Sequence, residues 1–366
     1  MKKIITVVGA RPQFVKAAVL SRLIRSDKWN DKFSEVLVHT GQHYDYGMSD
    51  VFFEEMEIPK PDYNLNIGSG THGKMTGEML IKIEEVLINE KPDFVLIYGD
   101  TNSTLAAALA ASKLHIKLIH VEAGLRSFWK AMPEEQNRIC SDHLSDFLFC
   151  PTDTAVRNLL KEGLTNGVHN VGDIMFDAFV YYNKKIESNY IELFEKLLSE
   201  NNIKTVNTNE KFFLLTIHRA ENTDSKERLT QILDALNALD CKAIYPAHPR
   251  TIKQMNKFGL QFSENINVIK PVGYFDMLVL MKMCDFIVTD SGGLQKEAYF
   301  AKRKCITLRD QTEWVETVNS GCNFLVGSDK DLLDAAVKAS TKLSFENKHF
   351  GNGDSASLML ELMLNG

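Results

Sequence analysis

The sequence has no run of about 18 apolar residues, no long basic run and no CxxC pair of cysteines. The first absence argues against a membrane-spanning helix, and the second against a nucleic-acid partner, which is bound by clustered Lys and Arg. The third leaves no structural zinc motif. The six cysteines lie mostly in apolar runs, which is typical of reduced, buried thiols in a cytoplasmic protein.

The N-terminal segment does not have the pattern of a secretion signal. MKKIITVVGARPQFVKAA carries two lysines and an apolar run, but Gly9 and Arg11 interrupt that run after about five residues. The segment therefore predicts a first β-strand. The formal net charge of −6 also means that an anionic ligand must be held by a local site.

Short apolar runs alternate with longer amphipathic stretches through most of the chain. Examples are IITVVG, DFVLIYGD, KLIHVEAG, FFLLTIH and DFIVTDSGG. Runs of this kind are typical of strands that helices cover on both faces of a parallel sheet. The predicted fold class is α/β, with two Rossmann-like doubly wound domains that face a cleft.

The same pattern predicts how the chain divides into domains. Residues 151–210 lack a clear strand and are rich in Asn, Lys and Glu, so we expect them to connect the two sheets. The predicted parts are an N-terminal domain at 1–169, a C-terminal domain at 170–350, and a C-terminal helix at 351–366 that can pack back on the N-terminal domain.

Polar residues follow nearly every predicted strand, which is where doubly wound folds bind their ligands. They are Arg11 and Lys16, Gln42 and His43, Asp100, Glu122, His218 and Arg219, His248 and Arg250, Ser291, and Arg309. Any one of them alone is as readily a helix cap or a surface charge. Together they favour a polar site.

This set predicts binding of a diphosphate and acid–base chemistry. The groups that can neutralise a diphosphate are Arg11, Lys16, Arg309 and the turn of Ser291, Gly292 and Gly293. Proton abstraction and return require carboxylates such as Asp100, Glu122 and Glu134, and His218 can protonate a leaving oxygen. We expect no metal site, because the histidines and carboxylates lack short ligand spacing, and no hydrolase, because TDSGG is not a GxSxG motif.

The stretch DSGGLQKEA at residues 290–298 leaves two interpretations open. Two glycines directly after a buried strand can simply form a tight turn. Alternatively, they allow an anion to approach the free N–H groups of a helix N-terminus, where the helix dipole favours negative charge. The stretch alone does not decide between them.

Nine motifs, in order, resemble those of the non-hydrolysing UDP-N-acetylglucosamine 2-epimerases, a family with the glycosyltransferase-B fold. They are GARPQFVKAA, TGQH, GDTNST, HVEAGLRS, PEEQNR, HRAEN, HPR, DSGGLQKEA and RDQTE, and together with the WVE that follows RDQTE they span residues 9–316. The resemblance implies a homodimeric isomerase that needs no cofactor. It would invert sugar carbon 2 by eliminating UDP to a glycal and adding it back, in the synthesis of surface polysaccharide precursors.

The resemblance also implies roles for individual residues. Asp100, Glu122 and Glu134 would carry the acid–base and positioning work, and His218 would assist the departure of UDP. UDP would be held by Arg11, Lys16, Arg138, His218, Ser291, Gly292, Gly293 and Glu297, with Glu297 on the ribose hydroxyls. The other predicted substrate-binding residues are Gln42, His43, His248, Arg309 and Tyr274, the last beside the uracil or, equally well, in the core.

Two departures from the family motifs bear on the sugar. Ala220 in HRAEN and Trp314 in RDQTEWVE each stand where an Arg is common in the family. These stretches resemble the branch that acts on UDP-2,3-diacetamido-2,3-dideoxyglucuronate. For that larger and more anionic sugar, Arg219, Arg126 and Lys130 remain as cations, and Trp314 can pack against an acetamido methyl group.

The favoured function is therefore conversion of UDP-N-acetylglucosamine to UDP-N-acetylmannosamine, with the diacetamido glucuronate as the alternative substrate. A glycosyltransferase of the same fold also needs a diphosphate clamp, but no acceptor site is evident and three carboxylates exceed its needs. A non-catalytic UDP-sugar sensor would keep the clamp and could dispense with Asp100 and Glu122.

Overall fold

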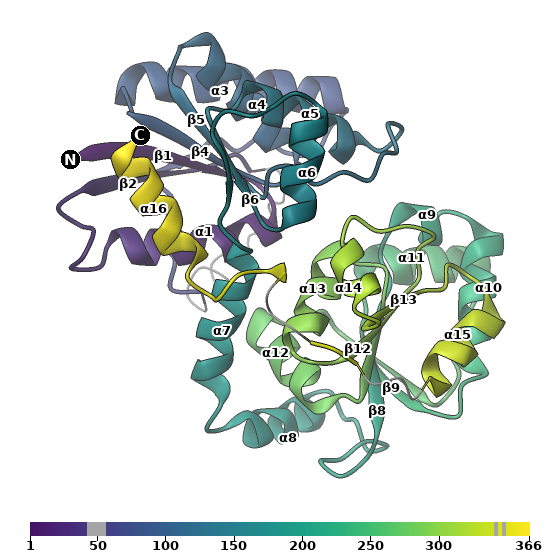
Figure 1. The fold of residues 1–366 in the computed structure, drawn as a ribbon. Coiled ribbons are helices and arrows are strands. Elements are labelled where there is room, and N and C mark those ends of the chain that lie inside the picture. Colours follow the sequence, from purple (N-terminus) through teal and green to yellow (C-terminus); the bar gives the residue numbers. More distant parts are fainter. Residues whose placement is uncertain (42–55, 340–342, 346–348) are drawn as a thin grey trace. The chain divides into compact units, whose positions relative to one another are not determined.

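The computed structural model describes residues 1–41, 56–339, 343–345 and 349–366. The chain forms two compact units, Met1–Val180 with Asn347–Gly366, and Tyr181–Glu346. Each unit is a parallel β-sheet with helices between its strands (Figure 1), which confirms the predicted α/β class. The division falls within helix α7 (Ile174–Ile186), whereas the sequence placed it between residues 169 and 170.

The first unit contains a seven-stranded sheet in the order β3-β2-β1-β4-β5-β6-β7. Its strands are β1 (Lys2–Val8), β2 (Phe33–His39), β3 (Tyr63–Asn64), β4 (Phe94–Tyr98), β5 (Lys117–Val121), β6 (Phe147–Cys150) and β7 (Val168–Asn170). Its helices besides the start of α7 are α1 (Arg11–Ile24), α3 (His72–Glu90), α4 (Asn102–Lys113), α5 (Pro133–Leu144), α6 (Asp153–Lys161) and α16 (Ser355–Asn365).

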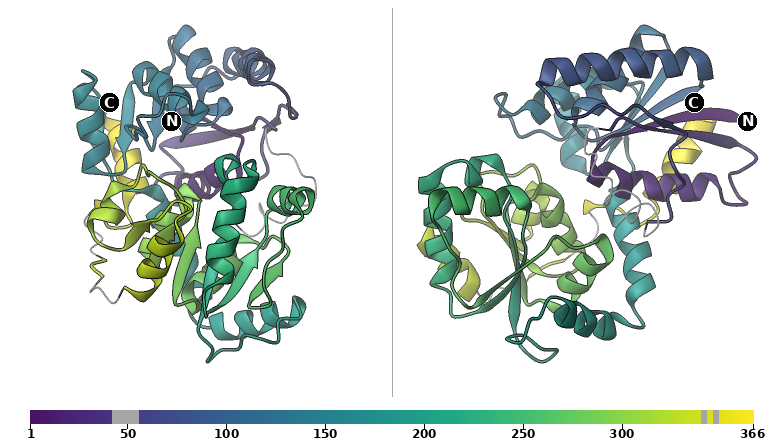
Figure 2. Two further views of the ribbon diagram at one scale, coloured as in Figure 1. Left: turned by 90° about the vertical axis from the view of Figure 1, so that its right-hand side faces the viewer. Right: turned by 180° about the vertical axis from the view of Figure 1, so that it is seen from behind.

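The strand order of this sheet reverses between β1 and β4, as a doubly wound sheet requires. Helices α3, α4 and α5 lie next to one another on one face, while α1 and α16 lie on the other (Figures 1 and 2). Because helices cover both faces, every residue of the β4 sequence FVLIY is buried.

The second unit contains a six-stranded parallel sheet in the order β10-β9-β8-β11-β12-β13, which reverses between β8 and β11. Its strands are β8 (Phe212–Thr216), β9 (Lys242–Pro246), β10 (Ile266–Ile269), β11 (Phe286–Thr289), β12 (Lys304–Thr307) and β13 (Asn323–Leu325). Its helices are α8 (Tyr190–Glu200), α9 (Ala220–Thr223), α10 (Lys226–Asn237), α11 (Pro249–Phe258), α12 (Tyr274–Met283), α13 (Gly292–Phe300), α14 (Val315–Asn319) and α15 (Lys330–Lys338).

The cysteines and the helix lengths add two observations. All six cysteines are free, and burial raises the pKa of Cys284 and of Cys305 to about 12, so these two thiols stay protonated at neutral pH. Among the helices that the structure describes, none combines the length and the apolar composition needed to cross a bilayer.

A buried carboxylate ties the C-terminal helix α16 to α7 within the first unit. Asp177 Oδ1 accepts a hydrogen bond from the backbone N–H of Ser355 at 3.2 Å, and Oδ2 accepts one from Ala356 at 2.9 Å. Burial raises the pKa of Asp177 to about 6, and the neighbouring Asp173 adds to the rise, although these two N–H groups oppose it. The folded protein therefore binds a proton at Asp177 more tightly than the unfolded chain does.

This pKa predicts a pH-dependent contribution to stability. The contribution is complete below pH 3.8, the ordinary value, and is lost as the pH rises through 6, a change of about 3 kcal/mol. Asn at 177 resembles the protonated acid, so Asp177→Asn should gain stability relative to the parent as the pH rises from 4 to 7. Denaturant unfolding at each pH measures the difference. The exposed Asp354→Asn, at the same helix start, is the control, and a constant difference for Asp177→Asn would contradict the prediction.

Candidate active site

Two carboxylates follow neighbouring strands in the first unit. Tyr98 at the end of β4 and Val121 at the end of β5 are partners in the parallel register. Glu122 is the residue after Val121, and Asp100 is the second residue after Tyr98. Gly99 has a left-handed backbone (φ +61°), and a Cβ there would lie 3.4 Å from Glu122 Oε2. Glycine suits this position because of its left-handed backbone, whereas a Cβ would meet Glu122 only at ordinary contact distance.

Glu122 forms an ion pair with Lys16, which α1 positions after β1. The two side chains are only 8% and 10% exposed. Glu122 itself has a left-handed backbone (φ +74°), which costs a non-glycine residue about 1 kcal/mol or more. The N–H groups of Glu122 and Ala123 both donate to the Phe149 carbonyl and hold this conformation. Strain of this kind is common where a charged side chain must be aimed at a site.

Arg138 on α5 connects Asp100 with a second glutamate, Glu135. Its Nη2 contacts the Asp100 carboxylate, and its Nη1 donates to Glu135 Oε2 at 2.9 Å. Arg138 and Glu135 are buried, whereas the Asp100 side chain is 31% exposed. Of these three charged side chains, Asp100 is therefore the one that solvent or a ligand can reach.

The two glutamates of PEEQNR have different surroundings. Glu134, the predicted candidate, is half-buried in the first turn of α5 and makes no hydrogen bond or ion pair with any described residue. Glu135, which sequence reasoning missed, is the buried one. No signal in the sequence separates adjacent glutamates, because the rotation of the helix decides which of them faces Arg138.

A buried network supports the turn after β4. His120 Nε2 lies 2.7 Å from the Gly99 carbonyl oxygen, and His120 Nδ1 lies 2.7 Å from Asp142 Oδ1. Arg126 donates to Asp142 at 2.6 Å and to both oxygens of Glu162. Burial alone would raise the pKa of Asp142, but His120 and Arg126 outweigh it and lower this pKa. Arg126 is thus occupied, and the expectation that it remains free for a substrate carboxylate is wrong.

Three predicted residues near β1 and β2 cannot be placed in this way. Arg11 is the first residue of α1, but its side chain is outside the described part of the structure. Gln42 and His43 lie outside the described residues altogether.

In the second unit, Asp290 holds the turn that follows β8. Its fully buried carboxylate accepts hydrogen bonds from the backbone N–H groups of His218 and Arg219 at 2.9–3.1 Å, and from Asn222 Nδ2 at 3.0 Å. His218 Nδ1 lies 3.3 Å from Asp290 Oδ1, and the imidazole is 38% exposed. Burial lowers the pKa of His218, and Arg219 lowers it further against the opposing effect of Asp290. A neutral imidazole with Nδ1 on Asp290 leaves Nε2 for a ligand.

The two glycines of DSGG, in the turn between β11 and α13, have different surroundings. Ser291 caps the helix, with its Oγ accepting from Leu294 N at 3.4 Å. Gly292 is buried, and a Cβ there would lie 2.5 Å from Glu313 Oε1. Gly293 is exposed, and a Cβ there would meet no atom nearer than Ser291 Oγ at 4.0 Å. Packing therefore explains Gly292, whereas Gly293 leaves open space that an anion could occupy.

The segment after β12 is fastened to the same unit. Arg309 is buried, donates to Glu313 at 3.0 Å and lies 3.6 Å from Glu221, so two carboxylates already balance its charge. Trp314 is 3% exposed, and Lys296 Nζ lies 3.9 Å from its ring centroid. This buried cation–π contact leaves Trp314 no surface for an acetamido methyl group, contrary to the expectation.

Tyr274, the first residue of α12, is a core aromatic. It is buried, and its ring packs edge-on against Tyr182 with centroids 5.6 Å apart. Burial, and then the adjacent Glu297 carboxylate on α13, raise the pKa of Tyr274 well above its usual value. Glu297 is half-buried at this position.

His248 lies near His218 and caps α11. Its Nδ1 accepts a hydrogen bond from Arg250 N at 3.2 Å, and its ring centroid is 6.0 Å from that of His218. Two imidazoles thus stand after the neighbouring strands β8 and β9. The described residues contain no group of three or more His, Cys or carboxylate side chains arranged to hold a metal ion.

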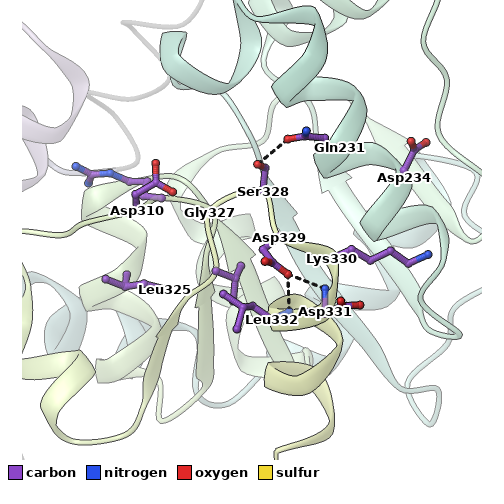
Figure 3. A pocket seen from close by; sticks show the side chains of 12 residues that line it. Gln231, Asp234, Asp310, Leu325, Gly327, Ser328, Asp329, Lys330, Asp331 and Leu332 are labelled. Atoms are coloured by element: carbon purple, nitrogen blue, oxygen red, sulfur yellow. Dashed lines mark hydrogen bonds between the residues drawn. The ribbon is translucent and has the colours of Figure 1, made fainter.

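The second unit also contains a pocket of about 790 Å³, beside the segments that follow β12 and β13 (Figure 3). Its lining includes four aspartates, Asp234, Asp310, Asp329 and Asp331, with Lys330 and Arg309 as the cations. An excess of negative charge disfavours a diphosphate there. Of the predicted site residues, only Arg309 contributes to its lining.

Comparison with known proteins adds the family. A family model described as UDP-N-acetylglucosamine 2-epimerase matches residues 27–364. A Methanococcus maripaludis protein named UDP-N-acetylglucosamine 2-epimerase homolog is 52% identical, over 99% of each chain. A Pseudomonas aeruginosa UDP-2,3-diacetamido-2,3-dideoxy-D-glucuronate 2-epimerase is 46% identical, over 99% of each chain. The crystal structure of the Methanocaldococcus jannaschii UDP-GlcNAc 2-epimerase in complex with UDP-GlcNAc and UDP has a TM-score of 0.90 and 44% identity, with 100% of both chains covered.

The two glycines of DSGG permit a matched test of the anion site. Gly293→Ala adds a methyl group to open space at a helix start, so it should keep or slightly raise stability. If UDP sits against this turn, the same methyl group should weaken UDP binding about tenfold, or about 1.4 kcal/mol. Calorimetric titration with UDP measures this effect. Gly292→Ala, which collides with Glu313, should instead lower stability. Unchanged UDP affinity in Gly293→Ala would mean that the DSGG motif is only a structural turn and not an anion site.

Proposed function

Because the chain belongs to the UDP-N-acetylglucosamine 2-epimerase family, we propose that it is an isomerase that inverts carbon 2 of a UDP-2-acetamido sugar, with UDP-N-acetylglucosamine as the favoured substrate. The observation that carries the proposal is the pair of carboxylates after β4 and β5, each held on a buried cation. A homodimer is a prediction from the family resemblance alone, and a cytoplasmic location is a prediction from the cysteine pattern.

The proposed reaction needs a proton carrier on each face of the sugar. One carboxylate removes the proton of carbon 2 while the bond from carbon 1 to UDP breaks and a glycal forms. A second group then returns a proton to the opposite face of carbon 2 as UDP bonds again to carbon 1. Asp100 and Glu122 suit this because they follow adjacent strands and have different partners, Arg138 and Lys16. Such differences in environment separate the acid and base roles of two carboxylates.

The second unit supplies the groups that we propose for the nucleotide. The N-terminus of α13, with Ser291 and the open Gly293, offers backbone N–H groups to the diphosphate. His218 is oriented by Asp290, and the charge of a bound diphosphate would oppose the lowering of its pKa by burial. Binding would thus favour the imidazolium that can stabilise departing UDP.

Proton exchange with solvent tests the reaction class. In heavy water, the protein should place deuterium at carbon 2 of UDP-N-acetylglucosamine without any acceptor, which neither a glycosyltransferase nor a sensor does. Asp100→Asn and Glu122→Gln should each lower the rate by about 10² or more, because general acid–base groups contribute 10²–10⁴. Their UDP affinity should stay within a few fold. A parental exchange rate in either variant would remove that carboxylate from the mechanism.

The alternative sugar is UDP-2,3-diacetamido-2,3-dideoxyglucuronate, which the similarity to the Pseudomonas aeruginosa enzyme favours. Two residues that were expected to favour this sugar are engaged elsewhere: Arg126 pairs with Asp142, and Trp314 is buried against Lys296. Arg219 and the exposed Lys130 remain as cations.

Side-by-side kinetics decide between the two sugars. We expect kcat/KM for UDP-N-acetylglucosamine to exceed that for the uronate by tenfold or more, a difference of about 1.4 kcal/mol in transition-state binding. Removing the exposed cation with Lys130→Ala should leave this ratio unchanged. A higher kcat/KM for the uronate would reverse the substrate assignment while leaving the reaction class intact.

A further inference from the structure

Glu135 is a buried carboxylate with three donors around it. Its side chain accepts hydrogen bonds from the backbone N–H groups of Ser127 at 2.9 Å and Phe128 at 2.8 Å, and from Arg138 Nη1 at 2.9 Å. Glu135 is 1% exposed, so it has no access to substrate. A buried charge satisfied by three donors is costly to disturb and fixes the geometry of each donor.

One of those donors belongs to a strained residue. Phe128 has a left-handed backbone (φ +59°), which is rare for a bulky residue, yet its side chain is 75% exposed and gains little from packing. The hydrogen bond to Glu135 Oε1 therefore accounts for this conformation. Glu135 fixes the segment before α5 as well as the guanidinium of Arg138.

The same guanidinium connects Glu135 with the proposed catalytic Asp100. Nη1 binds Glu135 and Nη2 contacts Asp100, so one cation is shared by a buried carboxylate and an accessible one. Within the described part of the structure, other charged or titratable groups also lie near the turn after β4. Lys16 and Glu122 have atoms 3.7 Å and 3.4 Å from the Cβ position of Gly99, and His120 Nε2, whose ring also contacts Asp142, lies 2.7 Å from the Gly99 carbonyl oxygen. Lys16 and Glu122 form an ion pair, and His120 is paired with Asp142. Arg138 is the described cation that contacts Asp100, and Glu135 is a second carboxylate bound to that cation.

We propose that Glu135 is a positioning residue that keeps the Arg138 guanidinium on Asp100 and, by sharing its charge, sets how tightly Asp100 holds its proton. The inference rests on the proposed function in taking Asp100 as the proton carrier. Without the negative charge of Glu135, the full charge of Arg138 would act on Asp100 and favour its ionised form.

The test replaces the charge and keeps the shape. In Glu135→Gln the amide oxygen can still accept from Arg138, so the titration of Asp100 should move to lower pH by about one pH unit. Carboxyl ¹³C NMR of aspartate-labelled protein follows this titration, with the Asp100 signal assigned by its loss in Asp100→Asn. A titration midpoint that is unchanged or higher overturns the proposal. A merely structural role would not move it in the expected direction.

Two control variants separate charge from loop geometry. Glu135→Asp keeps the charge, so the Asp100 midpoint should stay near that of the parent. Phe128→Gly relaxes the left-handed backbone without touching any carboxylate, and should leave the midpoint unchanged. Glu135→Gln in the Phe128→Gly background serves if the single variant is unstable, because glycine tolerates φ +59°. A shifted midpoint in Phe128→Gly alone would also overturn the proposal.

Kinetics give a readout that depends on the reaction. With the sugar that the parent protein converts, Glu135→Gln should lower kcat about tenfold and leave KM within threefold. The limb of the pH–rate profile that Asp100 governs should move to lower pH. If the parent protein shows no exchange at carbon 2 with either sugar, the proposed function fails, while the NMR titration still decides the role of Glu135.

Discussion

Hydrogen bonding between parallel neighbouring strands is the constraint on which the rest of this structure depends. In the first unit it pairs Tyr98 with Val121, and in the second it pairs Thr216 with Thr289. Because parallel strands all end at one edge, the residues that come after them meet there although they are far apart in the sequence. The carboxylates after β4 and β5 and the histidine and serine turns after β8 and β11 owe their proximity to this register.

Burial of charge is the second constraint, and it explains much of the local geometry. A cation taken out of water must have a carboxylate or hydrogen-bonding partner, and the first unit provides one for each of Lys16, Arg126 and Arg138. The carboxylates paired with these cations then hold the neighbouring turns in place. Removing one member of such a pair leaves an uncompensated charge, so these side chains are coupled in both stability and chemistry.

The two units use the same device to fix a turn. Glu135 accepts the backbone N–H groups of Ser127 and Phe128, and Asp290 accepts those of His218 and Arg219. In each case a buried carboxylate substitutes for water at backbone donors that a loop would otherwise leave unsatisfied. The loop is thereby preorganised, and a neighbouring functional group, Arg138 or the His218 imidazole, is oriented by the same carboxylate.

The sequence by itself determined the fold class, the family and the polar residues at the strand ends. Buried runs such as FVLIY are typical of covered strands, and doubly wound topology brings the residues after these strands to one edge of the sheet. Asp100, Glu122 and His218 were identified from this pattern. The ends of these strands can be located from the local pattern of apolar residues, and that pattern can be read directly from the sequence.

Tertiary structure alone decided which polar groups are free and which are already used. Glu135 rather than Glu134 binds Arg138, Arg126 is occupied by Asp142, and Trp314 lies under Lys296. Arg126 lies in the loop before α5 and Asp142 within α5, while Lys296 lies in α13 and Trp314 just before α14. The folding of loops against helices brings each pair together. Pairing of buried charges depends on such contacts, so no local pattern could have predicted it.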